Sequence, residues 1–245
     1  MLQPITKRQK DILLFLYRFR FLNRIQIQKL LNHKNPKNTN EWLKDLTEKK
    51  YIERIFEKIP GINKPAIYYL TANGIKFLKS LEGIQIEYLK KLRQEKRKTK
   101  AFIDQSIEIG NIYLNLNSQN LTGFKFYTQN DFPVNGIIRE LSPTFAYVID
   151  DQNTMKQYSC EVIKPNMPRF AIRSRIAKYL EFFSSKINVN IIFICPNYSI
   201  KKYLIKFIQK QLIEENIDNL VIYVVTIDAI SKLGIEQSIL EEIEH

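Results

Sequence analysis

Three stretches decide the fold of the first part of the chain: Lys37–Lys49 (KNTNEWLKDLTEK), Tyr51–Phe56 (YIERIF) and Ala66–Leu70 (AIYYL). The first predicts a helix, because Trp42, Leu43 and Leu46 recur at helical spacing and give it an apolar inner side. The other two have strand character and enclose a turn rich in Pro and Gly. Together they predict a helix followed by a two-stranded hairpin.

Two further helices are expected before this stretch. One runs from Thr6 to Arg18 with Thr6 as its N-cap, and the other begins after a cap at Asn23. After the hairpin, Thr71 is the expected cap of another helix. Three short helices followed by a hairpin is the order of a winged helix-turn-helix. The predicted fold class of this part is therefore an α+β winged helix.

A winged helix places the N-terminal turn of its third helix in the major groove, which is about 12 Å wide. Lysine and amide side chains suit this position because they pair with phosphates and with purine edges. The hairpin then lies along the phosphate backbone. The side chains expected to contact duplex DNA are Lys34, Lys37, Asn38, Thr39, Asn40, Lys44, Lys58, Lys64, Lys96, Arg97 and Lys98.

The charge distribution agrees with a polyanionic partner. Residues 1–100 contain 24 Lys and Arg against 9 Asp and Glu, a net charge of +15, whereas residues 101–245 contain 14 against 16, a net charge of −2. A basic half joined to a nearly neutral half indicates that one part meets a polyanion. The expected domains are a winged-helix DNA-binding domain (1–86), a basic linker helix (87–100) and an α/β domain (101–245).

Composition excludes several classes of function. The chain has 2 His and 2 Cys, too few for a His-based catalytic triad, a multi-His zinc site or a disulfide framework. No glycine motif for binding phosphate is present. No apolar run approaches the roughly 18 residues that span a bilayer, and no secretory signal is visible. We therefore expect a cytoplasmic protein with no membrane partner and no required cofactor.

The second half predicts an α/β domain with a mixed sheet, because strands alternate with helices. A helix is expected over 101–116, followed by a strand hairpin and a third strand. The later strands are near-continuous apolar runs, as in strands buried on both faces. The expected strands are 124–127, 145–149, 158–163, 189–195 and 220–225, and the later helices are 169–185, 199–215 and 231–244.

This order, with certain short motifs, resembles the PD-(D/E)XK nuclease-like domains. The motifs are Leu141–Thr144 (LSPT), Ser159–Lys164 (SCEVIK), Lys178–Leu180 (KYL) and Phe193–Pro196 (FICP). Combined with an N-terminal winged helix, the chain resembles the replication-relaxation family of plasmid and mobile-element proteins. That resemblance implies a role in the replication, transfer or regulation of a plasmid, phage or integrative element. It implies double-stranded DNA as a partner.

The departures from the nuclease motif are as informative as the matches. In that superfamily an Asp and a Glu hold Mg²⁺, but Thr144 stands at the Asp position and Lys164 falls one residue late on its strand. Glu161 alone cannot hold the metal, so it is expected to be a structural residue paired with Arg173 or Arg175. No catalytic residue and no metal ligand are assigned, and the domain is expected to be an inactive nuclease-like fold.

Two alternatives stay open at this stage. The first is a Mg²⁺-dependent DNA endonuclease that rebuilds its site from Glu108, Glu140, Glu161 and Lys164. The second is a protein-interaction module without DNA binding, since winged helices also bind proteins. Replication or transfer proteins are further expected partners, through the C-terminal domain. Winged helices often bind DNA as dimers, so a homodimer is among the expected states, although the sequence shows no dimerisation seam.

Overall fold

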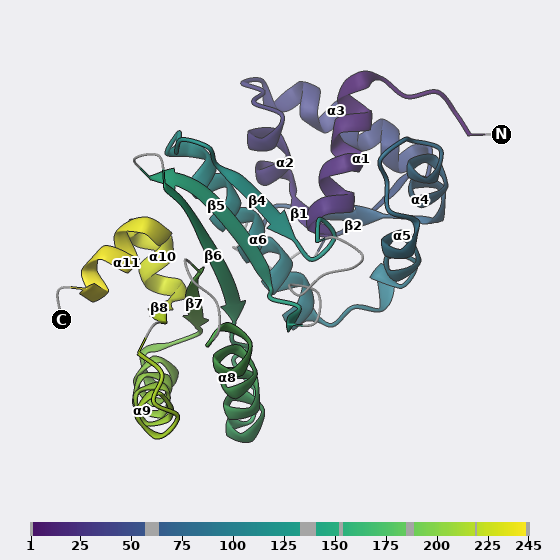
Figure 1. Ribbon diagram of the computed structural model, residues 1–245. Helices are drawn as coiled ribbons and strands as arrows, with labels where there is room; N and C mark the ends of the chain where they lie inside the picture. Colours follow the sequence, from purple (N-terminus) through teal and green to yellow (C-terminus); the bar gives the residue numbers. More distant parts are fainter. Residues whose placement is uncertain are drawn as a thin grey trace. The chain divides into compact units, whose positions relative to one another are not determined.

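A computed structural model describes residues 2–56, 64–132, 141–151, 154–184, 189–218 and 220–243 (Figure 1). The chain divides into two compact units, residues 1–114 (unit 1) and residues 115–245 (unit 2). Within the described ranges, none of the helices combines the length and the apolar character needed to cross a membrane.

Unit 1 combines helices with a small antiparallel sheet. In the sheet, β3 lies between β1 and β2 and pairs with both. The elements are α1 (Lys7–Phe19), β1 (Leu22–Asn23), α2 (Arg24–Leu30), α3 (Pro36–Glu48), β2 (Ile52–Ile55), β3 (Ile67–Leu70), α4 (Ala72–Lys79), α5 (Ile86–Leu92), the 3-10 helix η1 (Glu95–Arg97) and most of α6 (Lys100–Ser118).

The predicted helix caps are confirmed. Thr6 and Asn23 each form a capping box with the glutamine three residues later. The cap side chain accepts a hydrogen bond from the glutamine backbone N–H, and the glutamine side chain accepts one from the cap backbone N–H. The Thr71 side chain accepts a hydrogen bond from the backbone N–H of Gly74 at the start of α4. These local signals explain why the beginnings of the helices could be predicted from the sequence.

The core of unit 1 lies between α1, α2, α3 and the sheet. Ile12, Leu16, Ile27 and Leu46 are fully buried. Tyr51, which connects α3 to β2, is also fully buried. At Gly74 in α4, an added Cβ would lie 2.3 Å from the carbonyl oxygen of Tyr51. Glycine therefore allows α4 to pack directly against the start of β2.

The basic segment 87–100 is built into unit 1 as short elements. It contains most of α5, then η1 and the first residue of α6. The side chains of Tyr88, Leu89, Leu92 and Glu95 are buried, and Glu95 forms an ion pair with Arg20. The segment is therefore not the single helix expected from the sequence, and Arg20 and the apolar side chains hold it against the unit.

Unit 2 is organised around a five-stranded sheet in the order β4-β5-β6-β7-β8. Strand β5 pairs antiparallel with both β4 and β6, whereas β6, β7 and β8 pair in parallel, so the mixed sheet is confirmed. The elements are β4 (Lys125–Thr128), β5 (Phe145–Asp151), β6 (Thr154–Val162), α8 (Arg169–Phe183), β7 (Val189–Cys195), α9 (Tyr198–Glu214), β8 (Val221–Thr226), α10 (Ile227–Leu233) and α11 (Ile235–Ile243).

The helices α8 and α9 share one apolar core with the sheet. Ile176 and Tyr179 of α8, Leu204 of α9 and Phe193 of β7 are fully buried members of this core. The Tyr179 and Phe193 rings meet edge to face with their centroids 5.2 Å apart. This packing fixes which side of α8 faces the sheet.

Two predictions for the end of the chain are corrected. The expected single helix 231–244 is two helices, α10 and α11, separated at Gly234, whose φ of +83° lies in a region that favours glycine. The strand expected to be buried on both faces, β8, is the sheet edge, and Val221 is 47% exposed. An apolar run alone does not distinguish an edge strand from a central one.

Candidate nucleic-acid interface

Helix α3 presents one polar face to solvent. Asn35 caps it by accepting a hydrogen bond from the backbone N–H of Lys37 at 2.9 Å, and Pro36 occupies the first turn. Leu43 and Leu46 are buried on the inner side. The predicted contacts Lys37, Asn40 and Lys44 are exposed, and Asn38 is half-buried.

The prediction for Thr39 is corrected by its position on the helix. Its side chain is fully buried, because it lies one turn before Leu43 on the same inner side. It therefore belongs to the packing of α3 and does not reach the outer face. Trp42 is half-buried and meets His33 edge to face at a centroid distance of 5.0 Å.

A groove of about 860 Å³ runs between α3 and the β2–β3 strand pair. It brings together the predicted residues Asn40, Lys44 and Lys64 with two arginines that the sequence did not single out, Arg24 and Arg54. We call these five residues the α3 groove set. Among the described residues, its lining includes one carboxylate, Glu48, which lies 3.8 Å from the Lys44 ammonium across an exposed turn of α3. The groove is strongly cationic as a result.

Arg24 and Arg54 converge on Tyr68. Arg54 is the strand partner of Tyr68, and the backbone N–H of Arg24 donates to the carbonyl of Ala66 at 3.0 Å. Burial raises the pKa of the Tyr68 phenol, and the two nearby guanidinium groups oppose that rise. Both arginines come together through pairing of β3 with β1 and β2, which no local pattern in the sequence reveals.

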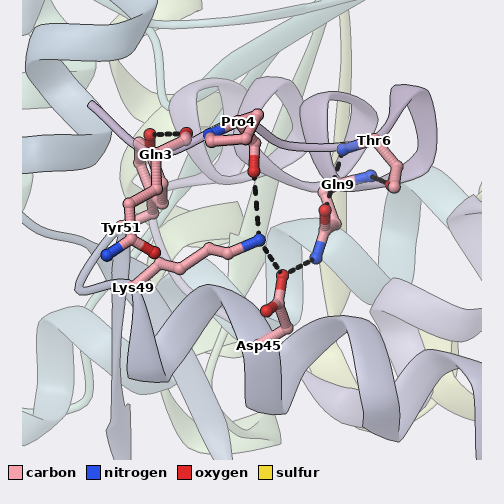
Figure 2. Close-up of polar contacts among 7 residues, drawn as sticks. All are labelled: Gln3, Pro4, Thr6, Gln9, Asp45, Lys49 and Tyr51. Atoms are coloured by element: carbon pink, nitrogen blue, oxygen red, sulfur yellow. Dashed lines mark hydrogen bonds and ion pairs between the residues drawn. The ribbon is translucent and has the colours of Figure 1, made fainter. Parts of the chain in front are cut away.

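A polar cluster fixes the other end of α3 to the N-terminal segment (Figure 2). Figure 2 shows the Asp45 carboxylate accepting hydrogen bonds from Gln9 and from the Lys49 ammonium, the latter at 2.7 Å. Lys49 also donates to the carbonyl of Pro4 at 3.0 Å, and the Tyr51 hydroxyl donates to the carbonyl of Gln3. The cluster therefore holds the C-terminal end of α3 against the start of α1, away from the first turn of α3.

The remaining predicted cations that the structure describes do not line the α3 groove. Lys34 is exposed just before α3. Lys96 and Arg97 are exposed on η1, and the Lys98 ammonium lies 5.2 Å from the centre of the Phe102 ring. Lys58 falls outside the described residues. The structure thus separates the predicted contacts into a groove beside α3 and a second basic surface downstream.

In unit 2, Glu161 is a buried carboxylate with its charge balanced. Its Oε2 accepts hydrogen bonds from the Arg175 guanidinium at 2.9 Å, from the Tyr179 hydroxyl at 2.9 Å and from the Thr144 hydroxyl at 3.4 Å. Burial and the Glu161 charge raise the pKa of Tyr179 well above its usual value, so it stays protonated as a donor. The pairing expected with Arg173 or Arg175 is made with Arg175.

These residues do not fit a Mg²⁺ site. Thr144 is neutral, and its hydroxyl already accepts from the backbone N–H of Val162 at 3.0 Å. Mg²⁺ prefers carboxylate oxygens at an open site, whereas Arg175 occupies the Glu161 carboxylate. Among the described residues, no group of three or more His, Cys, Asp or Glu side chains could hold a metal ion.

Besides Glu161, the structure describes two residues of the endonuclease alternative, Lys164 and Glu108. Lys164 is exposed, beyond the end of β6. Glu108 belongs to unit 1, where burial raises its pKa and a hydrogen bond with Asn111 opposes the rise. Glu140 falls outside the described residues.

The sequence matches a known family over its first half. The model of a family described as Replication-relaxation matches residues 13–129, just under half of the chain. The family predicted from the sequence is therefore confirmed over this stretch. No curated protein matches the chain.

Two solved structures of a restriction endonuclease are similar to the chain. One is the structure of FokI bound to DNA, with 14% identity and a TM-score of 0.33, covering 96% of this chain and 46% of that one. The other is the structure of FokI, with 15% identity and a TM-score of 0.35, covering 100% and 48%. This chain spans about half the length of either FokI chain. At these TM-scores the likeness supports no conclusion about fold or function.

We expect Asp45→Asn to destabilise unit 1 at neutral pH. Hydrogen bonding from Lys49, with a further contribution from Gln9, lowers the pKa of Asp45 despite some burial. A lowered pKa in the folded state stabilises the fold above the unfolded value, near 3.8, and this contribution is lost as the pH falls through the folded value. The destabilisation should stay below about 1 kcal/mol, because the pair is partly exposed to solvent.

Thermal melts of the parent and of Asp45→Asn at pH 7 and at pH 3.5 would test this. The difference between the two proteins should shrink at the lower pH. Glu48→Gln removes another exposed ion pair of α3 and is the matched control, with little expected effect. A difference that is the same at both pH values would contradict the role given to the Asp45 charge.

We expect Arg175→Met to destabilise unit 2 by about 3 kcal/mol, because it leaves the Glu161 charge buried without its cation. The double variant Arg175→Met with Glu161→Gln should recover much of that stability, because the uncompensated charge is gone. Chemical denaturation of the three proteins measures both effects. An Arg175→Met protein as stable as the parent would show that Glu161 does not depend on this pair.

Proposed function

Starting from the replication-relaxation match over residues 13–129, we propose that this chain binds double-stranded DNA through α3 and the groove beside it. The observation that carries the proposal is the α3 groove set, in which Arg24, Lys44, Arg54 and Lys64 surround one open groove. Four cations on a concave surface attract a polyanion and leave it room to approach.

The topology of unit 1 supports a winged helix-turn-helix as the DNA-binding fold. Its order is α1-β1-α2-α3-β2-β3, with β3 in the centre of the sheet. In that fold the third helix enters the major groove and the strand pair lies beside the backbone. Here α3 carries Lys37 and Asn40 on its outer face, and β2 carries Arg54 beside it.

The residue types suggest separate roles in the proposed binding of bases and of phosphates. Asn40 and Lys37 lie in the first turns of α3, where amide and ammonium groups pair with base edges. Arg24, Arg54 and Lys64 line the groove beside the helix and are suited to phosphates. Lys96 and Arg97, exposed on η1, would add affinity that does not depend on sequence.

The biological setting we propose is the replication or transfer of a plasmid or other mobile element. The family description supports replication, and the charge of the first half supports DNA as the molecule acted on. Unit 2 is proposed as a nuclease-like domain without nuclease activity that serves assembly or partner binding. The Glu161–Arg175 pair supports this part of the proposal, because Arg175 occupies the Glu161 carboxylate that the nuclease motif would use.

The test of base reading is the double variant Lys37→Ala with Asn40→Ala. It should reduce the discrimination between DNA sequences selected by the parent protein, by roughly 1–3 kcal/mol for each base that is no longer read. Affinity for a selected duplex and for a scrambled duplex is measured at one salt concentration. Unchanged discrimination would place the base-reading surface elsewhere.

A contrasting variant, Arg24→Gln with Arg54→Gln, tests the phosphate contacts. It should weaken both duplexes alike and flatten the dependence of log affinity on log salt by roughly 0.9 for each phosphate that is no longer neutralised. Lys206→Gln, an exposed lysine on α9, is the control and should leave the slope unchanged. The absence of binding to any duplex at moderate salt would instead favour the protein-interaction alternative.

We also expect no cleavage of supercoiled plasmid in the presence of Mg²⁺ or Mn²⁺. Among the described residues, the carboxylate that the nuclease motif would use is Glu161, and it is paired with Arg175. Agarose gels of plasmid incubated with the parent and with Glu161→Ala would check this. Cleavage by the parent that disappears in Glu161→Ala would establish the endonuclease alternative.

A further inference from the structure

A second cavity lies on the opposite side of the β2–β3 strand pair from the α3 groove. It encloses about 760 Å³, and Glu53 and Tyr69 line it, whereas their chain neighbours Arg54 and Tyr68 line the α3 groove. Successive side chains of a strand point to opposite faces of the sheet. Glu53 pairs with Tyr69 and Arg54 with Tyr68, so the two cavities share one wall, a single layer of backbone.

The second cavity has an apolar floor. Leu70 of β3, Ile75 of α4, and Leu89 and Leu92 of α5 line it, and each is at most 7% exposed. The floor is therefore formed by core side chains and offers apolar contacts to a bound group.

The rim of the cavity is cationic. Lys76 and Lys79 come from α4, Lys90 and Arg93 from α5 and its C-cap, and Lys96 from η1, and all five are exposed. They surround the mouth from separate elements that unit 1 folds together.

The carboxylates near the rim are already engaged. Glu53 accepts a hydrogen bond from the Tyr69 hydroxyl, and the buried Glu95 pairs with Arg20. Lys90 pairs with Glu87 at 2.8 Å. Within the part of the chain that the structure describes, the other four rim cations, Lys76, Lys79, Arg93 and Lys96, form no ion pair. The rim thus has a surplus of positive charge.

We propose that this cavity binds a nucleoside polyphosphate, with the ring on the apolar floor and the phosphates at the cationic rim. An inorganic anion would leave the apolar floor exposed to water. An apolar molecule would leave the rim cations without a negatively charged partner. A ring that carries several phosphates satisfies both surfaces. The volume lies within the roughly 300–1,000 Å³ usual for small-molecule sites. The cavity shares no lining residue with the α3 groove, and its rim shares Lys96 with the second basic surface proposed for DNA.

Isothermal titration of the 245-residue chain with ATP in EDTA tests the proposal, with adenosine and inorganic tripolyphosphate as comparison ligands. ATP should bind at a single site at least about tenfold more tightly than either, because it alone uses both floor and rim. Tripolyphosphate binding as tightly as ATP would reduce the cavity to a phosphate-binding patch and overturn the proposal. No binding of ATP would also overturn it.

The variant Lys79→Gln with Arg93→Gln locates the site. It should weaken ATP binding roughly tenfold or more, because it removes two charge-assisted hydrogen bonds to the phosphates. Arg54→Gln, on the other side of the same strand, is the matched control: it should weaken DNA binding and leave ATP binding unchanged. Thermal melts establish that both variants are folded.

The opposite pattern would overturn the proposal and leave the proposed function standing. If Arg54→Gln abolished ATP binding and Lys79→Gln with Arg93→Gln did not, ATP would be occupying the α3 groove. Weakened DNA binding in Arg54→Gln with ATP binding intact separates the two sites. Binding of ATP by a protein that binds no duplex would support this inference and contradict the proposed function.

Discussion

The pairing register between β2 and β3 is the constraint on which the rest of unit 1 depends. It places Arg54 beside Tyr68 and Glu53 beside Tyr69. Side chains alternate along a strand, so a slip of one residue would exchange the two faces and move Arg54 away from α3. This register therefore places the α3 groove on one side of the strand pair and the second cavity on the other.

Several interactions from outside the strand pair fix that register. The backbone N–H of Arg24 donates to Ala66, which ties the start of α2 to the beginning of β3. Tyr51, fully buried, anchors the beginning of β2, and Asp45 and Lys49 hold the preceding helix to the N-terminal segment. Helix α3 and β2 are therefore positioned as one piece. The buried core side chains therefore determine the shape of the groove between them.

The sequence predicts the parts of this site that follow a local rule. Thr6, Asn23 and Thr71 were identifiable as caps because capping needs only the next few residues. The outer face of α3 was predictable from its helical period, with Thr39 misplaced because its hydroxyl suggested a polar position although it shares a side with Leu43. Arg24 and Arg54 were missed because they meet only when β1 and β2 pair with β3, from distant parts of the chain.

In unit 2, the sequence predicts an arginine partner for Glu161 but not which of two. Arg175 and Tyr179 are one helical turn apart, so both project from the same side of α8 toward Glu161, while Arg173 lies outside this stripe and is exposed. A buried strand end with two carboxylates needs a metal or a proton to balance its charge. Because Thr144 beside Glu161 is neutral, one carboxylate and one guanidinium balance each other. The Thr144 hydroxyl and the Arg175 guanidinium thus both hydrogen-bond the Glu161 carboxylate. Arg175 balances the Glu161 charge at the end of β6 without a metal ion.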